Sequence, residues 1–245
     1  MALLSFASSG CWADDDRIRV INVFGRGGLD HEDAQAIADR VSNVARAEMK
    51  LSERMKVGVG ATHLEAAVIV DEHSTPRANF AGGATWPLDL GTFVSESDHA
   101  EGSKVAVIGW PVRDRLFRAN AKPLGEQVFI AGIGFRVIGV LGAHPPFVDD
   151  LLPDLQDDWD EEKTAVALAT RVYVPFNAGR NLFSATAKNN ALIRVWVKDQ
   201  ASIDATRTEV RQVLEQRTGR PVMLQIVTFP PSSTPTADNS FGDTT

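Results

Sequence analysis

Alternation of polar and apolar side chains predicts strands near both ends of the chain. Residues 17–24 alternate in this way, which is typical of a strand with one buried face. Residues 55–59 and 64–70 are apolar stretches that predict two more strands. Residues 192–197 and 222–229 are rich in branched and aromatic side chains and predict strands near the other end. The chain is therefore expected to begin and end with sheet-forming segments.

Each end of the chain also carries apolar positions at helical spacing. Asp30 is a candidate N-cap residue, and a helix with one buried face is expected after it. A second helix is expected after the candidate cap Ser202 and should end at Gly219. The apolar faces of the two helices comprise Ala34, Ile37, Val41, Val44 and Ala45, and Ile203, Val210, Val213 and Leu214. Two such β-α-β halves can form one sheet with both helices on one face, because right-handed crossovers favour that packing.

The middle of the chain is expected to be rich in strands. Residues 105–108 form a short apolar run that suits a buried strand, and Pro111 suits the first turn of a short helix. Residues 128–141 predict a hairpin with glycine in its loop, and residues 172–176 predict a strand that ends at proline. Residues 71–103 show little regular pattern. The fold class that we predict is α+β, with two β-α-β halves in one sheet and an inserted β-rich subdomain.

Composition and charge exclude some functions. The chain has 245 residues, with 44% hydrophobic and 23% charged residues, as in ordinary globular proteins. Its net charge of −7 arises largely from an acidic segment at residues 149–162, and the rest is close to neutral. A basic patch for nucleic acid is therefore not expected. The acidic segment could bind Ca²⁺, but it lacks the residue order of a calcium loop, and a solvated insertion is the favoured interpretation.

No set of polar residues has the spacing of a catalytic or metal site. Five residues invite a metal interpretation, namely Asp71, Glu72, His73, Asp98 and His99. A zinc site needs three or four ligands at defined spacing, and two distant histidines among surface-type residues do not supply it. We therefore predict no catalytic residue, no cofactor-binding residue and no metal ligand.

Other candidate motifs favour structural interpretations. The Gly-Arg-Gly-Gly sequence at residues 25–28 could cradle a phosphate, but it lacks the lysine of a P-loop and is better explained as a strand-to-helix turn. The Gly-x-Ser-x-Gly motif of serine hydrolases is absent from the sequence. Cys11 lies in the leader, a poor place for a nucleophile, and His31 at the start of a helix is expected to be exposed.

The first residues leave several alternatives open. Residues 1–16 lack the basic residues that precede the apolar core of a signal peptide. Residues 8–11 resemble a lipoprotein cleavage site, except that Ser8 stands where an apolar residue is usual. The end of a preceding membrane segment is a further interpretation. No run of 18 apolar residues is present, so no spanning segment is predicted and the chain itself is expected to be soluble. A single cysteine excludes an intrachain disulfide.

Several motifs in order carry a resemblance to a known family. They are Val-Ala-Val-Ile-Gly at 105–109, Leu-Phe at 116–117, Pro-Leu-Gly at 123–125, Val-Ile-Gly-Val at 137–140 and Val-Tyr-Val-Pro-Phe at 172–176. In this order the chain resembles the extracytoplasmic, periplasmic core domain of MacB-type ABC transporter permeases, within the FtsX-like superfamily. It departs from the family pattern at Arg118, where glycine is usual, and at Thr92, where arginine is usual.

The resemblance implies a domain organisation and a function. It implies a discontinuous α/β, porter-like subdomain over 17–90 and 185–230, a β-rich, sabre-like subdomain over 91–184, and disordered ends at 1–16 and 231–245. It implies a non-catalytic domain at the periplasmic face of the bacterial inner membrane. Such a domain would couple ATP hydrolysis by a cytoplasmic ABC ATPase to movement of a periplasmic substrate or partner. The implied partners are that ATPase, an adaptor or lipoprotein, and a second permease in a homo- or hetero-dimer.

Two other functions are considered. A free-standing periplasmic ligand- or protein-binding module is the main alternative, and flanking apolar spans of about 20 residues would exclude it. A hydrolase whose site follows no motif is the other, and it would need a cleft with converging polar groups.

Overall fold

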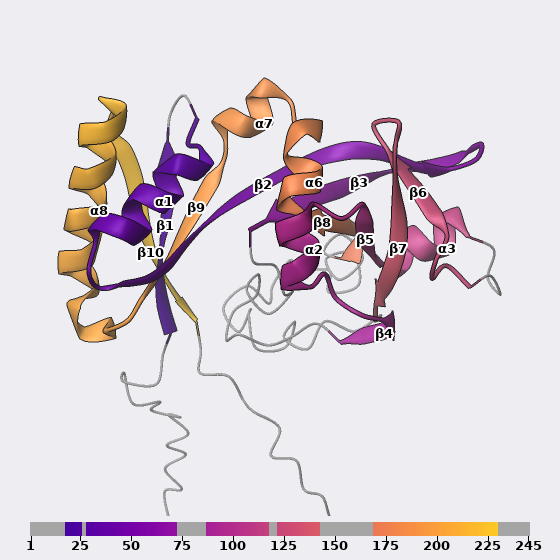
Figure 1. Cartoon of the computed structure of the whole chain (residues 1–245), viewed down its shortest axis with the longest axis horizontal. Coiled ribbons are helices and arrows are strands. Elements are labelled where there is room, and N and C mark those ends of the chain that lie inside the picture. Colours follow the sequence, from indigo (N-terminus) through magenta and orange to yellow (C-terminus); the bar gives the residue numbers. More distant parts are fainter. Residues whose placement is uncertain (1–17, 26–27, 73–86, 118–121, 143–168, 230–245) are drawn as a thin grey trace, which may run out of the picture.

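The computed structural model describes residues 18–25, 28–72, 87–117, 122–142 and 169–229 of the chain. The described strands form one ten-stranded sheet, and helices flank it (Figure 1). The elements are β1 (Ile18–Gly25), α1 (His31–Arg40), β2 (Val44–Val59), β3 (Thr62–Asp71), β4 (Leu88–Gly91), α2 (Glu96–Glu101), β5 (Val105–Gly109), α3 (Trp110–Leu116), β6 (Gln127–Ile130), β7 (Ile133–Leu141), β8 (Arg171–Pro175), α6 (Phe176–Gly179), η4 (Arg180–Leu182), α7 (Ala185–Asn189), β9 (Leu192–Val197), η5 (Gln200–Ser202), α8 (Ile203–Thr218) and β10 (Val222–Phe229). The strand order is β10-β1-β9-β2-β3-β8-β5-β7-β4, and β6 pairs with β2 and β7.

The two ends of the chain interleave in one part of the sheet. Strand β1 lies between β10 and β9 and is antiparallel to both, and β9 pairs antiparallel with the first part of β2. The units β1-α1-β2 and β9-α8-β10 therefore contribute alternate strands. Helices α1 and α8 lie together on one face of these strands (Figure 1). This arrangement confirms the predicted sheet of two β-α-β halves with both helices on one face.

Strand β2 belongs to both lobes of the molecule. Its first part, residues 44–50, pairs with β9, and its second part, residues 50–59, pairs with β3. Strand β3 pairs in parallel with β8, which brings the lobe of α2, α3 and α6 onto the same sheet. The long strand β2 runs from one lobe into the other, and β3 lies beside its second part (Figure 1). Backbone hydrogen bonds of a single strand therefore connect the lobes.

Helix α1 begins where the sequence predicts, but it ends before the last residues of the predicted helical face. The Asp30 side chain accepts a hydrogen bond from the Asp33 backbone N–H, and the Asp33 side chain accepts one from the Asp30 N–H. This capping box satisfies two N–H groups at the helix start. The last helical residue is Arg40. The expected helical face through Val44 and Ala45 is wrong, because β2 begins at Val44 and Ala45 lies in a β-bulge of that strand.

The middle of the chain contains the predicted strands and a helix that was not predicted. Strand β5, the β6–β7 hairpin, strand β8 and the short helix α3 confirm the expected elements. Strand β4 and helix α2 lie in the segment for which we expected little regular structure, so that expectation is wrong for residues 88–101. Ser95 and Asp98 form a capping box at the start of α2. Ser-x-x-Asp is a local signal for such a helix start.

Two apolar cores lie on opposite faces of the sheet. The larger core runs under α1 and α8 and continues into the second lobe, and Ile37, Val195 and Ile108 belong to it. The smaller core lies in the second lobe and consists of Ile69, Val94, Val107, Leu141, Ala169 and Tyr173. Adjacent residues of β5 thus enter different cores, as the alternation of side chains along a strand requires. Strands β5 and β8 of the second lobe are therefore buried on both faces.

Charged side chains lie side by side on the face of β2 and β9 that is opposite α1 and α8. Glu48 lies opposite Arg194 on β9, and Lys50 lies opposite Asp71 on β3. Glu48, Asp71 and Arg194 are 1%, 2% and 9% exposed. Burial lowers the pKa of Lys50 to about 8, against the opposing effect of the Asp71 carboxylate. Burial also lowers the pKa of Arg194. The shared strand therefore carries buried charges of both signs at its centre.

Replacing Gly109 with alanine should destabilise the protein strongly. A Cβ atom at Gly109 would lie 1.6 Å from the backbone carbonyl oxygen of Ala169, which cannot rotate away. We expect a loss of about 3 kcal/mol or more in the free energy of unfolding, measured by urea denaturation. Gly60→Ala is the matched control, because no atom lies within 4 Å of its added Cβ and only the positive φ of 57° opposes it, at about 1–2 kcal/mol. Equal losses in the two variants would contradict the close approach at Gly109.

Lys50→Met should remove a pH dependence of stability. The pKa of Lys50 is about 8 in the folded protein and 10.5 as its ordinary value. At a pH between these two pKa values, Lys50 is protonated in the unfolded chain but largely neutral in the folded chain. Lys50 therefore makes the free energy of unfolding rise with pH, by up to about 3 kcal/mol. The free energy of unfolding of the wild type relative to Lys50→Met should therefore rise from pH 7.5 to pH 10. A difference that stays constant over this range would show that the Lys50 ammonium is not desolvated.

Candidate functional site

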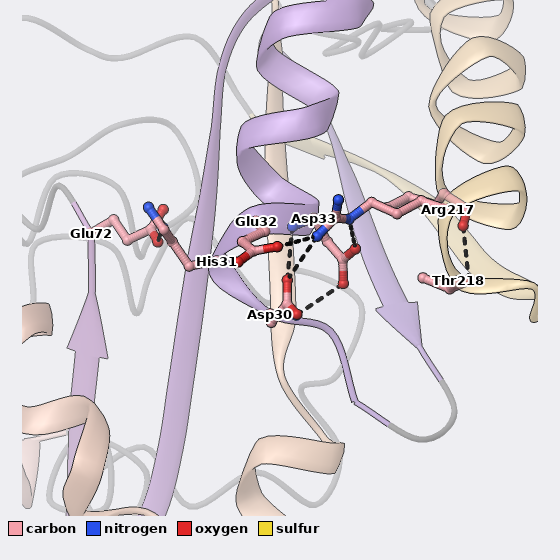
Figure 2. Close-up of polar contacts among 8 residues, drawn as sticks. Asp30, His31, Glu32, Asp33, Glu72, Arg217 and Thr218 are labelled. Carbon is pink, nitrogen blue, oxygen red and sulfur yellow. Dashed lines mark hydrogen bonds and ion pairs between the residues drawn. The ribbon is translucent and has the colours of Figure 1, made fainter.

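The polar residues around the start of α1 form a network of side-chain contacts that links several elements (Figure 2). We call this region the α1 junction. It comprises Asp30, His31, Glu32, Asp33, Glu72 and Arg217. One side of the junction links α1 to α8 within the first lobe, and the other side links α1 to the second lobe.

On the first side, Arg217 near the end of α8 contacts three carboxylates at the start of α1 (Figure 2). Its Nε donates to Asp33 Oδ1 at 2.7 Å, and its Nη2 donates to Glu32 Oε2 at 2.7 Å. The carboxylate of Asp30 lies 3.9 Å from the same Nη2. The hydrogen bonds that Arg217 donates to Glu32 and Asp33 raise the pKa of its guanidinium, which stays charged. A cation at a helix C-terminus and anions at a helix N-terminus also complement the two helix dipoles.

On the second side, His31 contacts the lobe beyond β2. Its Nδ1 lies within hydrogen-bond distance of the Glu72 carboxylate, and the other oxygen of that carboxylate accepts from the Met49 N–H at 3.1 Å. The ring of His31 lies 6.0 Å from the ring of Phe176 at the start of α6. The side chain of His31 is 52% exposed, as expected from the sequence. One half-exposed imidazole therefore connects α1 to the end of β3 and to α6.

A cleft of about 400 Å³ lies beside this contact, between α1 and the helices α2 and α6. His31 and Gln35 line one wall, and Glu96, His99 and Asn177 line the other. Ala47, Ala100 and Phe176 also line the cleft, so polar and apolar side chains both face it. No group of three metal-ligating side chains occurs among the residues that the structure describes.

The residues considered for a metal site have other contacts. His99 is buried, and its Nδ1 accepts a hydrogen bond from the Phe176 N–H at 3.4 Å. Asp98 belongs to the capping box of α2, and hydrogen bonds from Ser95 lower its pKa although partial burial opposes them. The expectation of surface-type residues is wrong for His99 and Asp71, which are 8% and 2% exposed. His73 lies outside the described residues.

Other segments considered in the sequence also lie outside the described residues. They are Cys11 and the rest of the leader, Arg26 and Gly27 of the glycine-rich turn, the acidic segment 149–162, and the C-terminal residues from 230. Gly28, at the end of that turn, has a φ of 91°, a conformation that favours glycine.

Sequence reasoning did not identify Arg217 as a partner of α1. The signal available was the Asp-His-Glu-Asp sequence at residues 30–33, which places three carboxylates at a helix start and so favours a nearby cation. Arg217 is separated from Asp33 by 184 positions, and 25 lysines and arginines compete for the role. The choice among them depends on how α1 and α8 pack, which the local sequence does not determine.

Within the described ranges, no helix combines the length and the apolar composition that crossing a membrane requires.

Comparison with known proteins identifies relatives over much of the chain. The family model of the MacB-like periplasmic core domain matches residues 3–213. The pyoverdine export ATP-binding/permease protein PvdT of Pseudomonas entomophila is 31% identical over 133 residues, which are 54% of this chain and 18% of that protein. The macrolide export ATP-binding/permease protein MacB of Azoarcus sp. is 32% identical over 155 residues, which are 61% of this chain and 21% of that protein. The chain thus spans about a fifth of the length of these relatives.

Two solved structures share the fold. The extracellular domain of the noncanonic ABC-type transporter YknZ from Gram-positive bacteria has a TM-score of 0.62 at 17% identity, covering 85% of this chain and 99% of that one. The periplasmic region of MacB from Actinobacillus actinomycetemcomitans has a TM-score of 0.61 at 17% identity, covering 84% and 87%. In this family the ATPase is a separate domain, so the segment matched here is non-catalytic. The chain therefore belongs to the family of MacB-like periplasmic core domains of ABC transporter permeases.

Proposed function

We propose that this domain transmits movement from the membrane part of an ABC transporter permease to a substrate or partner protein in the periplasm. In this proposal a cytoplasmic ABC ATPase supplies the energy, and the permease lies in the bacterial inner membrane. The relatives named above are export proteins, which favours outward movement.

The pairing of the first and last described residues carries the proposal. Ile18 at the start of β1 lies opposite Phe229 at the end of β10. The first and the last described residues therefore lie side by side, at the same end of the α/β lobe (Figure 1). A domain placed between two neighbouring membrane helices needs this geometry, because relative movement of the helices would then act on two adjacent strands.

The packing next to these strands suits a lever. Strands β10, β1, β9 and β2 are joined by antiparallel ladders, and α1 and α8 cover one face. Arg217 links the end of α8 to the start of α1. A packed core and a continuous ladder move as a unit, since tightly packed interiors deform little.

Three finer features belong to the same proposal. The domain works in a homo- or hetero-dimer of permeases, and it contacts a periplasmic adaptor or lipoprotein. The chain divides into an α/β subdomain of residues 17–90 and 185–230 and an inserted β-rich subdomain of residues 91–184, with β2 reaching between the two lobes of Figure 1.

A free-standing ligand- or protein-binding module is the second candidate. The cleft between α1 and α2 favours it, because its volume of about 400 Å³ falls within the range of small-molecule sites. A reading frame with an apolar span of about 20 residues on each side of the domain would exclude a free-standing module.

A change in the position of the domain with the nucleotide state of the ATPase is a direct test of the proposed lever. Spin labels are placed at Gln212, an exposed position on α8, in both copies of the assembled transporter. We expect the distance distribution between the labels to shift when ATP binds to a hydrolysis-deficient ATPase. The matched control is an ATPase variant that cannot bind ATP, and the 245-residue chain alone should not hydrolyse ATP. Identical distributions with and without bound ATP would contradict the proposed function.

Arg217→Met should reduce coupling in the same assembly. Loss of the link between α8 and α1 would let the helices shift against each other, so transport per ATP hydrolysed should fall while ATP hydrolysis continues. Arg207→Met is the matched control, because Arg207 pairs only locally with Asp204 at 2.9 Å on the exposed surface of α8. Circular dichroism of both variants checks that the domain is folded. If both variants transport the same amount per ATP, the Arg217 link plays no part in coupling.

A further inference from the structure

The two edges of the sheet differ in how they are protected from pairing with other strands. Strand β4 forms one edge and has four residues, a register shift between Leu88 and Leu90, and a charged residue, Asp89, that pairs with Arg113 at 2.6 Å. Short length, a bulge and charge are the usual means by which proteins prevent edge-to-edge association. Strand β10 forms the other edge and pairs only with β1 among the described residues.

Strand β10 has none of these protective features. It has eight residues, pairs with β1 in continuous register and has the sequence Val-Met-Leu-Gln-Ile-Val-Thr-Phe. The strand contains no charged residue and no proline. Leu224 and Ile226 pack towards the core under α8, whereas Met223 is 65% exposed. The outward N–H and C=O groups of β10 therefore form an uncharged row that another strand can pair with.

An open hollow lies at the start of the same strand. Its volume is about 790 Å³, and its apolar lining includes Phe24, Ala191 and Met223. Phe24 lies opposite Met223 in the ladder between β1 and β10, on the face away from Leu224. A strand added beside β10 would bring alternate side chains to this face, where the hollow can take an apolar one.

We propose that β10 is a docking edge for an extended, uncharged segment of a partner protein, which adds to the sheet as a further strand. The segment would alternate apolar and neutral polar residues and place an apolar side chain beside Met223. Main-chain hydrogen bonds give the affinity in this mode of recognition, and pockets for alternate side chains give the specificity. The inference deepens the proposed function by naming a surface for the periplasmic partner, and it rests on that function for the orientation of the domain.

Symmetry argues against a second copy as the occupant. Antiparallel pairing of two β10 strands needs a two-fold axis perpendicular to the strands, which would send the paired ends at Ile18 and Phe229 in opposite directions. Two permeases in one membrane need these ends on the same side. A two-fold axis along the strands keeps these ends on the same side, but it places the same residue of both copies at the same level along the axis. Hydrogen bonds between parallel strands are slanted and need the two strands to be offset, so this symmetry does not allow the pairing. The lever orientation therefore favours a different protein.

Binding of a synthetic peptide tests whether the edge strand β10 accepts a further strand. The probe is an acetylated and amidated peptide of about eight residues that alternates valine and threonine, added to the ¹⁵N-labelled 245-residue chain. We expect amide shifts and slower hydrogen exchange to concentrate in β10. A double variant, Met223→Lys with Gln225→Lys, should bind at least about tenfold more weakly, because lysine on an edge opposes strand addition. Gln212→Lys on the exposed side of α8 is the matched control and should bind like the wild type, and a peptide with a central proline should not bind.

Three outcomes would overturn the inference. The first is no change in β10 at millimolar peptide, and the second is equal binding by the double variant and the wild type. The third is self-association of the chain in analytical ultracentrifugation that the double variant abolishes, because the occupant would then be a second copy. The spin-label distances in the assembled transporter are measured separately, so failure of the docking edge is distinguishable from failure of the lever.

Discussion

The fold depends on the register of one strand. Strand β2 pairs with β9 in its first part and with β3 in its second part, so a single run of 16 residues aligns both lobes. Side chains alternate along it between the large apolar core and the opposite face. A slip of one residue would exchange the two sets, placing Met49 and Leu51 among charges and Glu48 in the core. Every contact between the lobes, including the one from His31 to Glu72, presupposes that register.

The buried charges on β2 and its neighbouring strands help to determine this register. Glu48, Lys50, Asp71 and Arg194 lie where two lobes share one strand, and burying them costs free energy relative to an apolar row of similar volume. Cross-strand pairs of opposite charge form in one register and are lost in its neighbours. The bulge at Ala45, near the start of β2, also sets the register of the pairs with β9 that follow it. Specificity of alignment is therefore the reason that we infer for charge at the centre of the sheet.

The parts of the fold that the sequence predicted well are those determined by neighbours in the chain. The cap at Asp30, the end of α8 at Gly219 and the β6–β7 hairpin depend on local hydrogen bonds and turn conformations. The prediction of a helical face through Ala45 is wrong because the extra residue of the bulge gives the apolar positions there a helix-like spacing. The next apolar residues, Ala47, Met49 and Leu51, alternate as in a strand. Helix α2 was missed although its Ser95–Asp98 box is local. The α1 junction was not predictable, since Arg217 and Asp33 meet only after both β-α-β halves have packed.

The α1 junction joins two connections of unequal strength, and this inequality bears on how force would pass through the domain. Within the first lobe, Arg217 makes two charged hydrogen bonds at 2.7 Å between α8 and α1, and the shared core reinforces them. Between the lobes, the side-chain link is a half-exposed histidine, and exposed contacts of this kind contribute about 1 kcal/mol or less. The α/β lobe should therefore turn as one body when its paired ends are displaced. This rotation reaches the second lobe through β2. The ladder between β2 and β3 resists separation of the strands more than it resists bending, and the cleft beside His31 is where such bending would change the structure most.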